Sequence, residues 1–365
     1  MLKTDFSPWP SFTEEEANAV SNVLLSNRVN YWTGEEARAF ESEFADWVNA
    51  KYAIALMNGT VALDVALNTF GVGPGDEVVV TPRSFIASVS CVVNAGATPV
   101  FADVDKESGN LSVESIAAVL SPRTKAIICV HLAGWPCEMD PIMGLAKKHG
   151  LYVVEDCAQE HGARYKDRSV GSIGDIGCWS FCQDKIMSTG GEGGMVTTNS
   201  KALWSKLWSY KDHGKSWEVV YEQEHPPGFR WVHESFGTNG RMTDMQAAIG
   251  RIQLKRMNDW HQFRSENANA ILECCEQFPT LFRVPRTPEH IEHAWYKCYV
   301  FVRPNGLAQG WARDRIIEEI NRTNLSQVLG EMVQCLDRNY EVSIPIDKEV
   351  EKISLPKNLH IIGTM

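Results

Sequence analysis

The sequence predicts an α/β fold built on a largely parallel sheet, and two features of the chain support this prediction. Between residues 52 and 156, short apolar runs (YAIAL, EVVV, KAIICV and LYVV) alternate with segments of helical length and periodicity. Strands that alternate with helices in this way form a parallel sheet with helices on both faces. In addition, no low-complexity segment and no internal repeat interrupts the alternation.

The expected elements follow one another in a regular order. Thr13 and Glu16 form a capping box before a first helix, and Phe40, Phe44 and Val48 mark the apolar side of a second helix over residues 35–49. Strands and helices then alternate over residues 52–56, 61–70, 77–82, 87–94, 98–105, 125–132, 141–149 and 151–156. A further, polar helix is expected between residues 105 and 125.

The regular alternation of strands and helices ends after about residue 255, and this change predicts two domains. Residues 1–255 form the large domain, and its last helix begins at a capping box of Thr243 and Gln246. Residues 256–365 form a smaller α+β domain. In this second part we expect a helix, a strand over YKCYVFV and an amphipathic helix over GWARDRIIEEINRT.

Composition and charge exclude several classes of function. The chain has 365 residues, 44% of them hydrophobic, which is enough to bury a large core. Its net charge of -11 argues against sequence-independent binding of nucleic acid. The ten cysteines show neither CxxC nor a metal-ligand spacing, so we expect no metal site, no disulfide framework and a reducing compartment. Without a signal peptide or a long apolar run, a soluble cytoplasmic protein is expected.

Lys185 lies in a glycine-rich turn between two apolar runs, residues 176–181 and 195–196. These runs predict buried strands, which place the lysine at the edge of the core. Most lysines are solvated surface charges, and that is the ordinary interpretation. Loss of hydration instead favours the neutral amine, a nucleophile that can form a Schiff base with a carbonyl group. Lys185 is therefore the first candidate catalytic residue.

Residues that directly follow the predicted strands supply further candidates, because ligands bind beyond the carboxyl ends of parallel strands. Gly59 and Thr60 begin a helix whose backbone N–H groups could bind a phosphate, or could form an ordinary capped start. Phe85 could stack on a planar ligand or belong to the core. Asp156 could pair with a ring nitrogen or cap the next helix, and Gln159 could reach a ring substituent.

Together these residues describe a site for pyridoxal 5'-phosphate. The cofactor offers an aldehyde for Lys185, a pyridine nitrogen for Asp156, a planar face for Phe85 and a phosphate for the helix that begins at Gly59. Each feature alone is common in proteins. Their occurrence in the order phosphate turn, aromatic ring, acid and lysine is what favours this cofactor.

The chain also carries long motifs in a fixed order, namely NGTVALDVAL, GVGPGDEVVVTPRSF, GATPVFADVD, RTKAIICVHLAGWPCEMDPI, EDCAQEHGA, WSFCQDKIMSTGGEGGMV and GTNGRMTDMQAAIG. These motifs resemble the DegT/DnrJ/EryC1/StrS family of sugar aminotransferases from about residue 10 to about residue 320. The resemblance implies pyridoxal-phosphate fold type I, the aspartate-aminotransferase architecture with a mostly parallel seven-stranded sheet. It also implies a homodimer with active sites at the subunit interface.

The resemblance gives roles to the residues of the expected cofactor site. Lys185 matches the lysine that holds the cofactor as a Schiff base, and Asp156 matches the partner of the pyridine nitrogen. Gln159 matches the residue that contacts the ring hydroxyl, and Phe85 occupies the stacking position. The residues that match phosphate contacts are Gly59, Thr60 and Ser180.

The GTNGRM motif implies contacts made across the dimer and with the substrate. Asn239 matches the asparagine that reaches the phosphate of the neighbouring subunit's cofactor. Arg241, in the same motif, is a candidate for binding a substrate carboxylate or phosphate. A long polar segment before this motif carries Lys211, Lys215 and Arg230, which are available to an anionic substrate, although a solvated loop is the simpler interpretation.

The resemblance implies transfer of an amino group from L-glutamate to a nucleotide-linked keto-deoxysugar. Such sugars enter cell-surface polysaccharides, including the O-antigen of lipopolysaccharide, or secondary metabolites. One alternative is a sugar dehydratase of the same family, which would carry histidine in place of Lys185. Another is a cofactor-binding regulator or inactive homologue, because the chain after about residue 323 departs from the family pattern. A nicotinamide dehydrogenase ranks last, because no GxGxxG follows the first strand.

Overall fold

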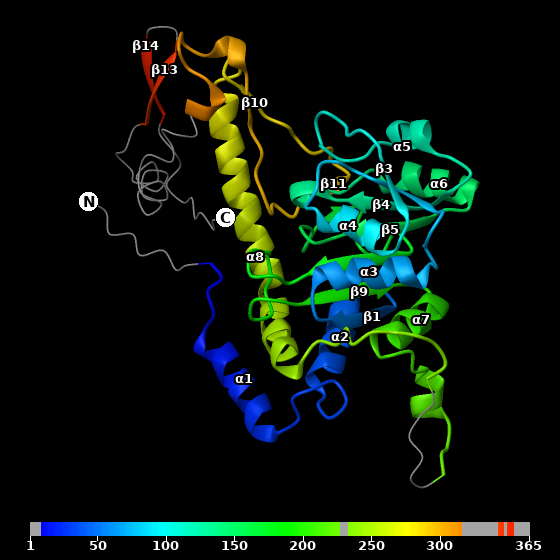
Figure 1. Cartoon of the computed structure of the whole chain (residues 1–365). Coiled ribbons are helices and arrows are strands. Elements are labelled where there is room, and N and C mark those ends of the chain that lie inside the picture. Colours follow the sequence, from blue (N-terminus) through cyan, green and yellow to red (C-terminus); the bar gives the residue numbers. More distant parts are fainter. Residues whose placement is uncertain (1–8, 227–232, 316–341, 347–348, 354–365) are drawn as a thin grey trace.

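The computed structural model describes residues 9–226, 233–315, 342–346 and 349–353. Its centre is a seven-stranded sheet with the strand order β1-β9-β8-β5-β4-β2-β3 (Figure 1). The strands span Tyr52–Leu56 (β1), Glu77–Val80 (β2), Thr98–Phe101 (β3), Thr124–Val130 (β4), Tyr152–Asp156 (β5), Ile176–Ser180 (β8) and Gly194–Thr198 (β9). Only β9 runs in the direction opposite to the other strands, which confirms the mostly parallel α/β fold.

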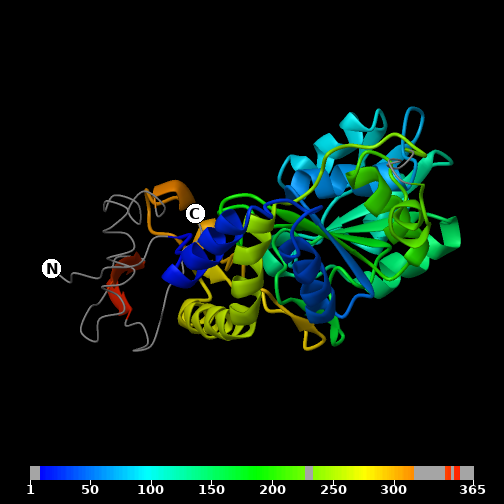
Figure 2. The ribbon, with the colours of Figure 1, turned by 90° about the horizontal axis from the view of Figure 1, so that it is seen from below.

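Helices cover both faces of this sheet, as Figure 2 shows. Neighbouring residues of β8 point to opposite faces, because side chains alternate along a strand. Cys178 contacts the helix α3 (Gly59–Thr69), where its Sγ lies 3.5 Å from the carbonyl oxygen of Ala62. Trp179 packs edge-on against Phe44 of the helix α2 (Glu36–Val48), with ring centroids 5.2 Å apart. Because both faces of the central strands are buried, their sequences are continuous apolar runs.

The helices around the sheet have the following bounds. They are Glu36–Val48 (α2), Gly59–Thr69 (α3), Ala87–Asn94 (α4), Val113–Val119 (α5), Met139–His149 (α6) and Lys201–Lys211 (α7). The helices α3, α4 and α7 form one layer, and α2, α5 and α6 lie on the opposite face.

The two capping boxes expected from the sequence are present, and they begin helices that pack together. One precedes α1 (Glu14–Ser26) and the other precedes α8 (Asp244–Glu276). Between these helices, the buried carboxylate of Glu16 accepts hydrogen bonds from Gln253 and Arg256, each at 3.1 Å. The helix α8 passes residue 255 without a break, and the division into domains 1–255 and 256–365 stays a prediction.

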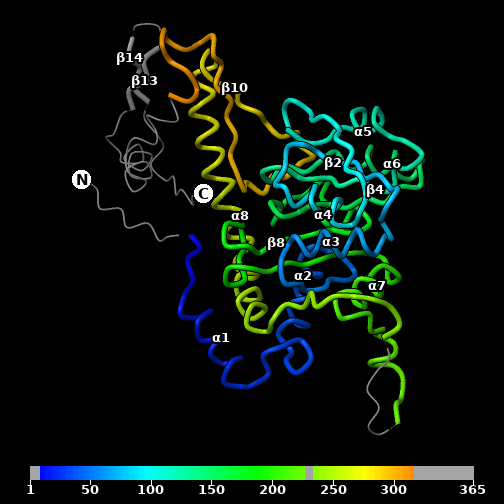
Figure 3. The backbone as a smooth tube through the Cα atoms, viewed as in Figure 1, coloured from blue at the N-terminus to red at the C-terminus, as the bar shows by residue number. Residues whose placement is uncertain are grey.

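After α8 the chain returns to the sheet, as the yellow and orange tube in Figure 3 shows. There β11 pairs with β6, and β10 pairs with β12 beside the end of α8. The remaining short elements are β6 (Arg164–Tyr165), β7 (Arg168–Ser169), β10 (Phe282–Arg283), β11 (Ile291–Glu292), β12 (Phe301–Val302), β13 (Val342–Ile346), β14 (Glu349–Ile353), η1 (Leu132–Gly134), η2 (Glu218–Glu222) and η3 (Pro304–Gly306).

The strand expected over residues 296–302 is wrong for most of its length, because only Phe301–Val302 is extended in a ladder. The backbone turns at Trp295, where φ is 55°, and this conformation ends an extended run. The helix expected over residues 310–323 lies largely outside the described residues, as does most of the sequence after residue 323. In the part of the chain that the structure describes, no helix has the length and apolar composition needed to cross a membrane.

Candidate active site

Lys185 lies in the loop between β8 and β9, as expected, and this loop is held from two sides. Within the loop, the amide of Gln183 donates to the carbonyl of Gly191 at 3.0 Å. From α8, the Gln253 side chain accepts a hydrogen bond from the amide of Ser188 at 2.9 Å. The lysine side chain is 15% exposed. A largely desolvated amine on a fixed loop is suited to covalent chemistry rather than to surface charge.

Asp156 ends β5 and is buried on the same edge of the sheet. Its Oδ2 accepts a hydrogen bond from the hydroxyl of Ser88 in α4 at 2.7 Å, and its Oδ1 accepts one from the amide of Ala158 at 3.2 Å. Burial raises the pKa of Asp156 above its ordinary value, although both hydrogen bonds and the positive charge of Lys185 act in the opposite direction. The carboxylate therefore gains from a cationic partner in the site.

The turn after β1 meets the end of β8 at very close range. Asn58 caps α3 by accepting a hydrogen bond from the amide of Val61 at 2.9 Å. A Cβ on Gly59 would come within 2.6 Å of the Cβ of Ser180, a distance that real Cβ atoms do not reach. Glycine is therefore required here, and it brings the first turn of α3 against the Ser180 hydroxyl. Thr60, the next residue, is exposed.

The Gly59→Ala variant should lose affinity for pyridoxal phosphate by about tenfold or more, because the added methyl group forces α3 away from Ser180. Gly144→Ala is the matched control, since Gly144 lies in α6 and a Cβ there meets nothing within 4 Å. Titration with the cofactor, followed by protein fluorescence, measures the affinity of both variants. Equal affinities in the two variants would contradict the role of this close approach.

Two other predicted residues lie near this edge in different environments. Gln159 accepts a hydrogen bond from the amide of Ala133 at 2.6 Å, which fixes its carboxamide after β5. The amide nitrogen of Gln159 then remains the donor end of the side chain. Phe85 lies in the loop between β2 and α4 and is 69% exposed, so it is not a core residue.

The GTNGRM segment runs beside the end of β1. The amide of Met57 donates to the carbonyl of Gly240 at 2.9 Å, next to Asn239. Arg241 donates from Nη1 to Oδ1 of the buried Asp212 at 2.7 Å, so its guanidinium is anchored by a carboxylate of its own chain. This segment is therefore positioned against the turn that carries Gly59.

Lys211 is not available to a substrate, contrary to one expectation from the sequence. Its side chain is fully buried, with Nζ 3.3 Å from the ring centroid of Tyr31 and no hydrogen-bond partner among the described residues. Burial lowers the pKa of Lys211 to about 8. Lys215 lies over the ring of Trp32 at 4.4 Å, and Arg230 lies outside the described residues.

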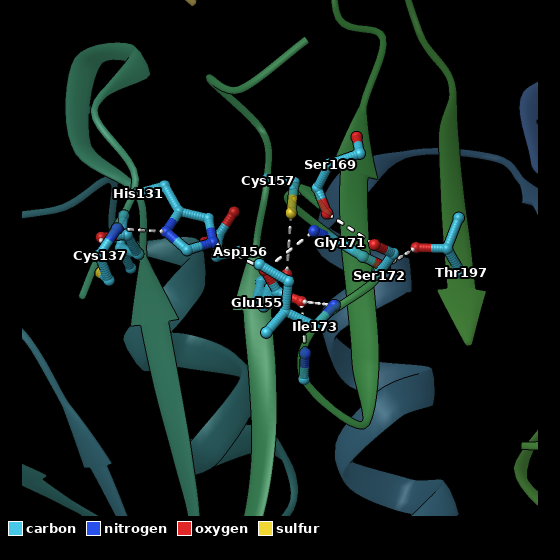
Figure 4. A network of polar contacts seen from close by, with 12 residues as sticks. His131, Cys137, Glu155, Asp156, Cys157, Ser169, Gly171, Ser172, Ile173 and Thr197 are labelled. Atoms are coloured by element: carbon cyan, nitrogen blue, oxygen red, sulfur yellow. Dashed lines mark hydrogen bonds and ion pairs between the residues drawn. The ribbon is translucent and has the colours of Figure 1, made fainter. Parts of the chain in front are cut away.

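A buried polar network supports the strand that carries Asp156 (Figure 4). His131, after β4, accepts a hydrogen bond at Nδ1 from the amide of Cys137 at 2.9 Å, so Nε2 carries the proton that faces Glu155 at 3.1 Å. The Glu155 carboxylate also accepts hydrogen bonds from the backbone amides of Gly171, Ile173 and Gly174 at 2.6 to 2.9 Å.

The same network contains a possible ligand set of His131, Glu155 and Cys157, whose ligand atoms lie within 4.8 Å of one another. Both ring nitrogens of His131 and both oxygens of Glu155 already take part in hydrogen bonds. Burial would raise the pKa of Glu155, but the hydrogen bonds from His131 and the backbone amides hold it below its ordinary value. The network is thus a support for β5 rather than a set of free ligands.

The Glu155→Gln variant should lower the free energy of unfolding at neutral pH by about 2 to 4 kcal/mol, because it breaks a fully buried and fully hydrogen-bonded charge network. The pKa of Glu155 is lower in the folded chain than in the unfolded chain. Its contribution is therefore present at neutral pH and is lost as the pH falls through the folded pKa.

Urea denaturation at several pH values measures the free energy of unfolding of both proteins. The difference in this free energy between wild type and Glu155→Gln should become smaller below about pH 4. Glu114→Gln, an exposed substitution in α5, is the control and should stay within about 0.5 kcal/mol of wild type. A gap that is independent of pH would contradict the assigned charge.

Comparisons with known proteins decide the family. A model of the DegT/DnrJ/EryC1/StrS aminotransferase family matches residues 10–332. The chain belongs to this family. GDP-perosamine synthase from Escherichia coli O157:H7 is 37% identical over 294 residues, which cover 80% of this chain and 77% of the relative.

Two further similarities agree with this family. A UDP-N-acetyl-3-dehydro-α-D-glucosamine 3-aminotransferase from Acidithiobacillus ferrooxidans is 36% identical over 81% of this chain and 75% of its own length. The X-ray structure of the aminotransferase from Psychrobacter cryohalolentis is similar with a TM-score of 0.86 and 65% identity, covering 87% of this chain and 82% of that one. The fold is pyridoxal-phosphate fold type I, as the sequence motifs implied.

Pyridoxal phosphate is the cofactor that this DegT/DnrJ/EryC1/StrS aminotransferase fold implies, and the residues present fit it. Asp156 is a buried carboxylate whose raised pKa reflects the need for a positive partner, which a protonated ring nitrogen supplies. At the start of α3, Gly59 packs against Ser180 and Thr60 is exposed, so backbone N–H groups of a helix N-terminus and two hydroxyl groups lie together, as a phosphate group requires. Lys185, in the neighbouring loop between β8 and β9, would supply the amine.

Sequence reasoning missed three residues of this site. Ser88 and Tyr296 contact Asp156 and Lys185 from distant parts of the chain, and no local pattern marks them. Asp184 had a signal in the sequence, because it is an acidic residue directly before the candidate lysine. Its carboxylate lies 3.0 Å from the Lys185 amine.

Proposed function

We propose that this aminotransferase moves an amino group from L-glutamate to the keto carbon of a nucleotide-linked deoxysugar. The observation that carries the proposal is the desolvated Lys185 amine on the edge of the sheet that also holds the buried Asp156. The relatives named for a GDP-linked and a UDP-linked sugar support the substrate class. Lysine rather than histidine at position 185 favours transfer over dehydration.

The cofactor and two residues of the chain would have the following roles in the reaction. When bound, pyridoxal phosphate supplies a carbonyl group that takes up the amino group and a ring that withdraws electrons from the carbon that loses a proton. The Nζ of Lys185 would hold the cofactor and would act as the base and acid that moves a proton. Asp156, fixed by Ser88, keeps a positive charge on the ring nitrogen.

Other residues would bind and orient the cofactor. The amide nitrogen of Gln159 is the donor for the ring hydroxyl, since its oxygen is occupied by Ala133. Phe85 would cover the ring face, and the phosphate contacts would come from Gly59, Thr60 and Ser180.

We further propose a homodimer with shared sites. Apolar side chains beside the site are exposed in the single chain, with Met57 at 41%, Phe85 at 69% and Ile86 at 66%. Phe236 is 99% exposed and stands three residues before Asn239, the residue expected to reach the partner's cofactor. A second copy of the chain would cover these surfaces. Arg241 is the proposed substrate contact, positioned by Asp212.

The cellular setting is also part of the proposal. Nine cysteines in the described residues are free thiols, which supports a reducing compartment, proposed to be the cytoplasm. The amino sugar would supply a cell-surface polysaccharide such as O-antigen or a secondary metabolite.

Incubation of the purified protein with pyridoxal phosphate, L-glutamate and keto-deoxysugars linked to GDP, UDP or dTDP tests the function. Mass spectrometry should detect an amino sugar and an equal amount of 2-oxoglutarate, and omission of the sugar should limit 2-oxoglutarate to about one per subunit. A product that has lost its hydroxyl group without gaining nitrogen would indicate a dehydratase. Cofactor binding without any reaction with glutamate would indicate a regulator or inactive homologue.

A further inference from the structure

Two side chains meet at the amine of Lys185: Asp184, which directly precedes it, and Tyr296, which comes from a distant part of the chain. The Oδ2 of Asp184 lies 3.0 Å from the Lys185 Nζ. The hydroxyl of Tyr296 donates to the same Oδ2 at 2.8 Å and accepts a longer hydrogen bond from the Nζ at 3.5 Å. The amine also lies 5.2 Å from the centre of the Tyr296 ring. One carboxylate oxygen is thus shared between the reactive amine and a phenol.

Tyr296 reaches this position through a strained and closely held backbone. Trp295 has a φ of 55°, in the left-handed region that is unfavourable for a bulky residue. The conformation is held because Trp295 stacks on His293 at 4.1 Å, and the amide of Lys297 donates to the carbonyl of Ala133 at 2.9 Å. Strain that persists beside a reactive group indicates a functional constraint on Tyr296.

The charges of the three groups follow from their surroundings. Burial would raise the pKa of Asp184, but the hydrogen bonds from Tyr296 and Lys185 hold it below its ordinary value. Burial, together with the neighbouring Asp184, raises the pKa of Tyr296. At neutral pH the pair is therefore a carboxylate and a neutral phenol that donates to it.

We propose that Asp184 and Tyr296 are positioning residues that together set how readily the Lys185 amine gives up and takes back a proton. This inference rests on the proposed function and extends it to residues that neither hold the cofactor nor match its known contacts. Asp184 favours the ammonium form of Lys185 by direct contact. Tyr296 weakens that hold, because its hydrogen bond withdraws charge from the shared oxygen.

The two residues should act in opposite directions when each is removed. Asp184→Asn removes the negative charge, so a larger fraction of Lys185 becomes the neutral, reactive amine. Tyr296→Phe removes the 2.8 Å hydrogen bond to Asp184 and also the longer, 3.5 Å hydrogen bond that the hydroxyl accepts from the Lys185 Nζ. The shorter bond is the stronger one, so its loss dominates: the carboxylate binds the ammonium group more strongly and the reactive fraction falls. A merely structural role for either residue would not produce opposite signs.

Other titratable groups surround the pair, and they set the conditions of the test. Cys182 lies beside Asp184, and Tyr299 adds to the electrostatic environment of Tyr296. Asp156 and His161 interact with Lys185 at longer range. Measurement at one fixed pH keeps the protonation of these groups the same in all variants.

The experiment is acetylation of the full-length protein, freed of cofactor, with trace acetic anhydride at pH 7.5. Mass spectrometry follows the rate at which Lys185 is acetylated, relative to the acetylation rate of the exposed Lys51 in the same molecule. We expect Asp184→Asn to raise the relative rate by about three- to tenfold and Tyr296→Phe to lower it by about twofold or more. Asp103→Asn, shortly after β3, and Tyr52→Phe, at the start of β1, are the matched controls and should leave the relative acetylation rate unchanged.

The outcome does not depend on catalysis. Opposite changes in the two variants support the proposal even if no sugar substrate is found, and activity assays on the wild type separately decide the proposed function. Unchanged rates in both variants, or changes in the same direction, would overturn it. Circular dichroism of each variant checks that the fold is retained.

Discussion

Lys185→Ala should abolish amino transfer, with a loss of about 10³-fold or more in kcat/KM. The amine of this lysine is the group that would hold the cofactor and move the proton, and no other described lysine lies between β8 and β9. The measurement is formation of 2-oxoglutarate from L-glutamate in a single turnover. Cofactor should still bind through the phosphate turn, at lower affinity.

The matched control for this variant is Lys201→Ala. Lys201 is an exposed lysine at the start of α7, and its replacement should leave turnover and melting temperature near the wild-type values. If Lys185→Ala retained wild-type turnover, the assignment of the reactive amine would be wrong. If both variants lost activity equally, the effect would not be specific to Lys185.

Asp156→Asn should lower kcat/KM by roughly 10²- to 10⁴-fold while leaving the fold intact. The amide retains the shape of the carboxylate: its oxygen can accept from the Ala158 amide, and its nitrogen can donate to the Ser88 hydroxyl, which reverses that hydrogen bond. It cannot keep a positive charge on the ring nitrogen. Asp103→Asn is the control, because Asp103 also follows a strand of the sheet but is exposed.

Stability provides a second measurement on the same variant. Because burial raises the pKa of Asp156, the carboxylate destabilises the cofactor-free protein at neutral pH. The Asp156→Asn protein without cofactor should therefore melt at a higher temperature than wild type. Glu155 is the adjacent contrast, since its pKa is lowered and its charge stabilises the fold. A lower melting temperature for Asp156→Asn would contradict this division of roles between the two carboxylates.

Local signals explain what could be predicted about the fold. The capping boxes at Thr13 and Thr243 depend on residues three positions apart, and both are present in the structure. The apolar runs that predicted β4, β5 and β8 are continuous because both faces of each strand are buried. The location of Asp156 and Lys185 at one edge of the sheet could be predicted from this topology, because ligand-binding residues lie beyond the carboxyl ends of parallel strands.

Contacts between distant residues explain what could not be predicted. The Lys211 ammonium looked available to a substrate, but Tyr31, which lies far away in the sequence, buries it. The apolar run at residues 296–302 favoured a strand, but the turn at Trp295 redirects Tyr296 toward Lys185. Ser88 shows the same limit, since its contact with Asp156 depends on how α4 packs on β5.

The most direct test of the central claim is to locate the lysine that carries pyridoxal phosphate. Reduction of the cofactor-loaded protein with sodium borohydride fixes the cofactor to the amine that holds it, and peptide mass mapping then identifies the residue. We expect the modification on Lys185, in the peptide around SFCQDKIMSTGG. Modification of another lysine, or of none, would contradict the assignment of Lys185 and with it the proposed chemistry.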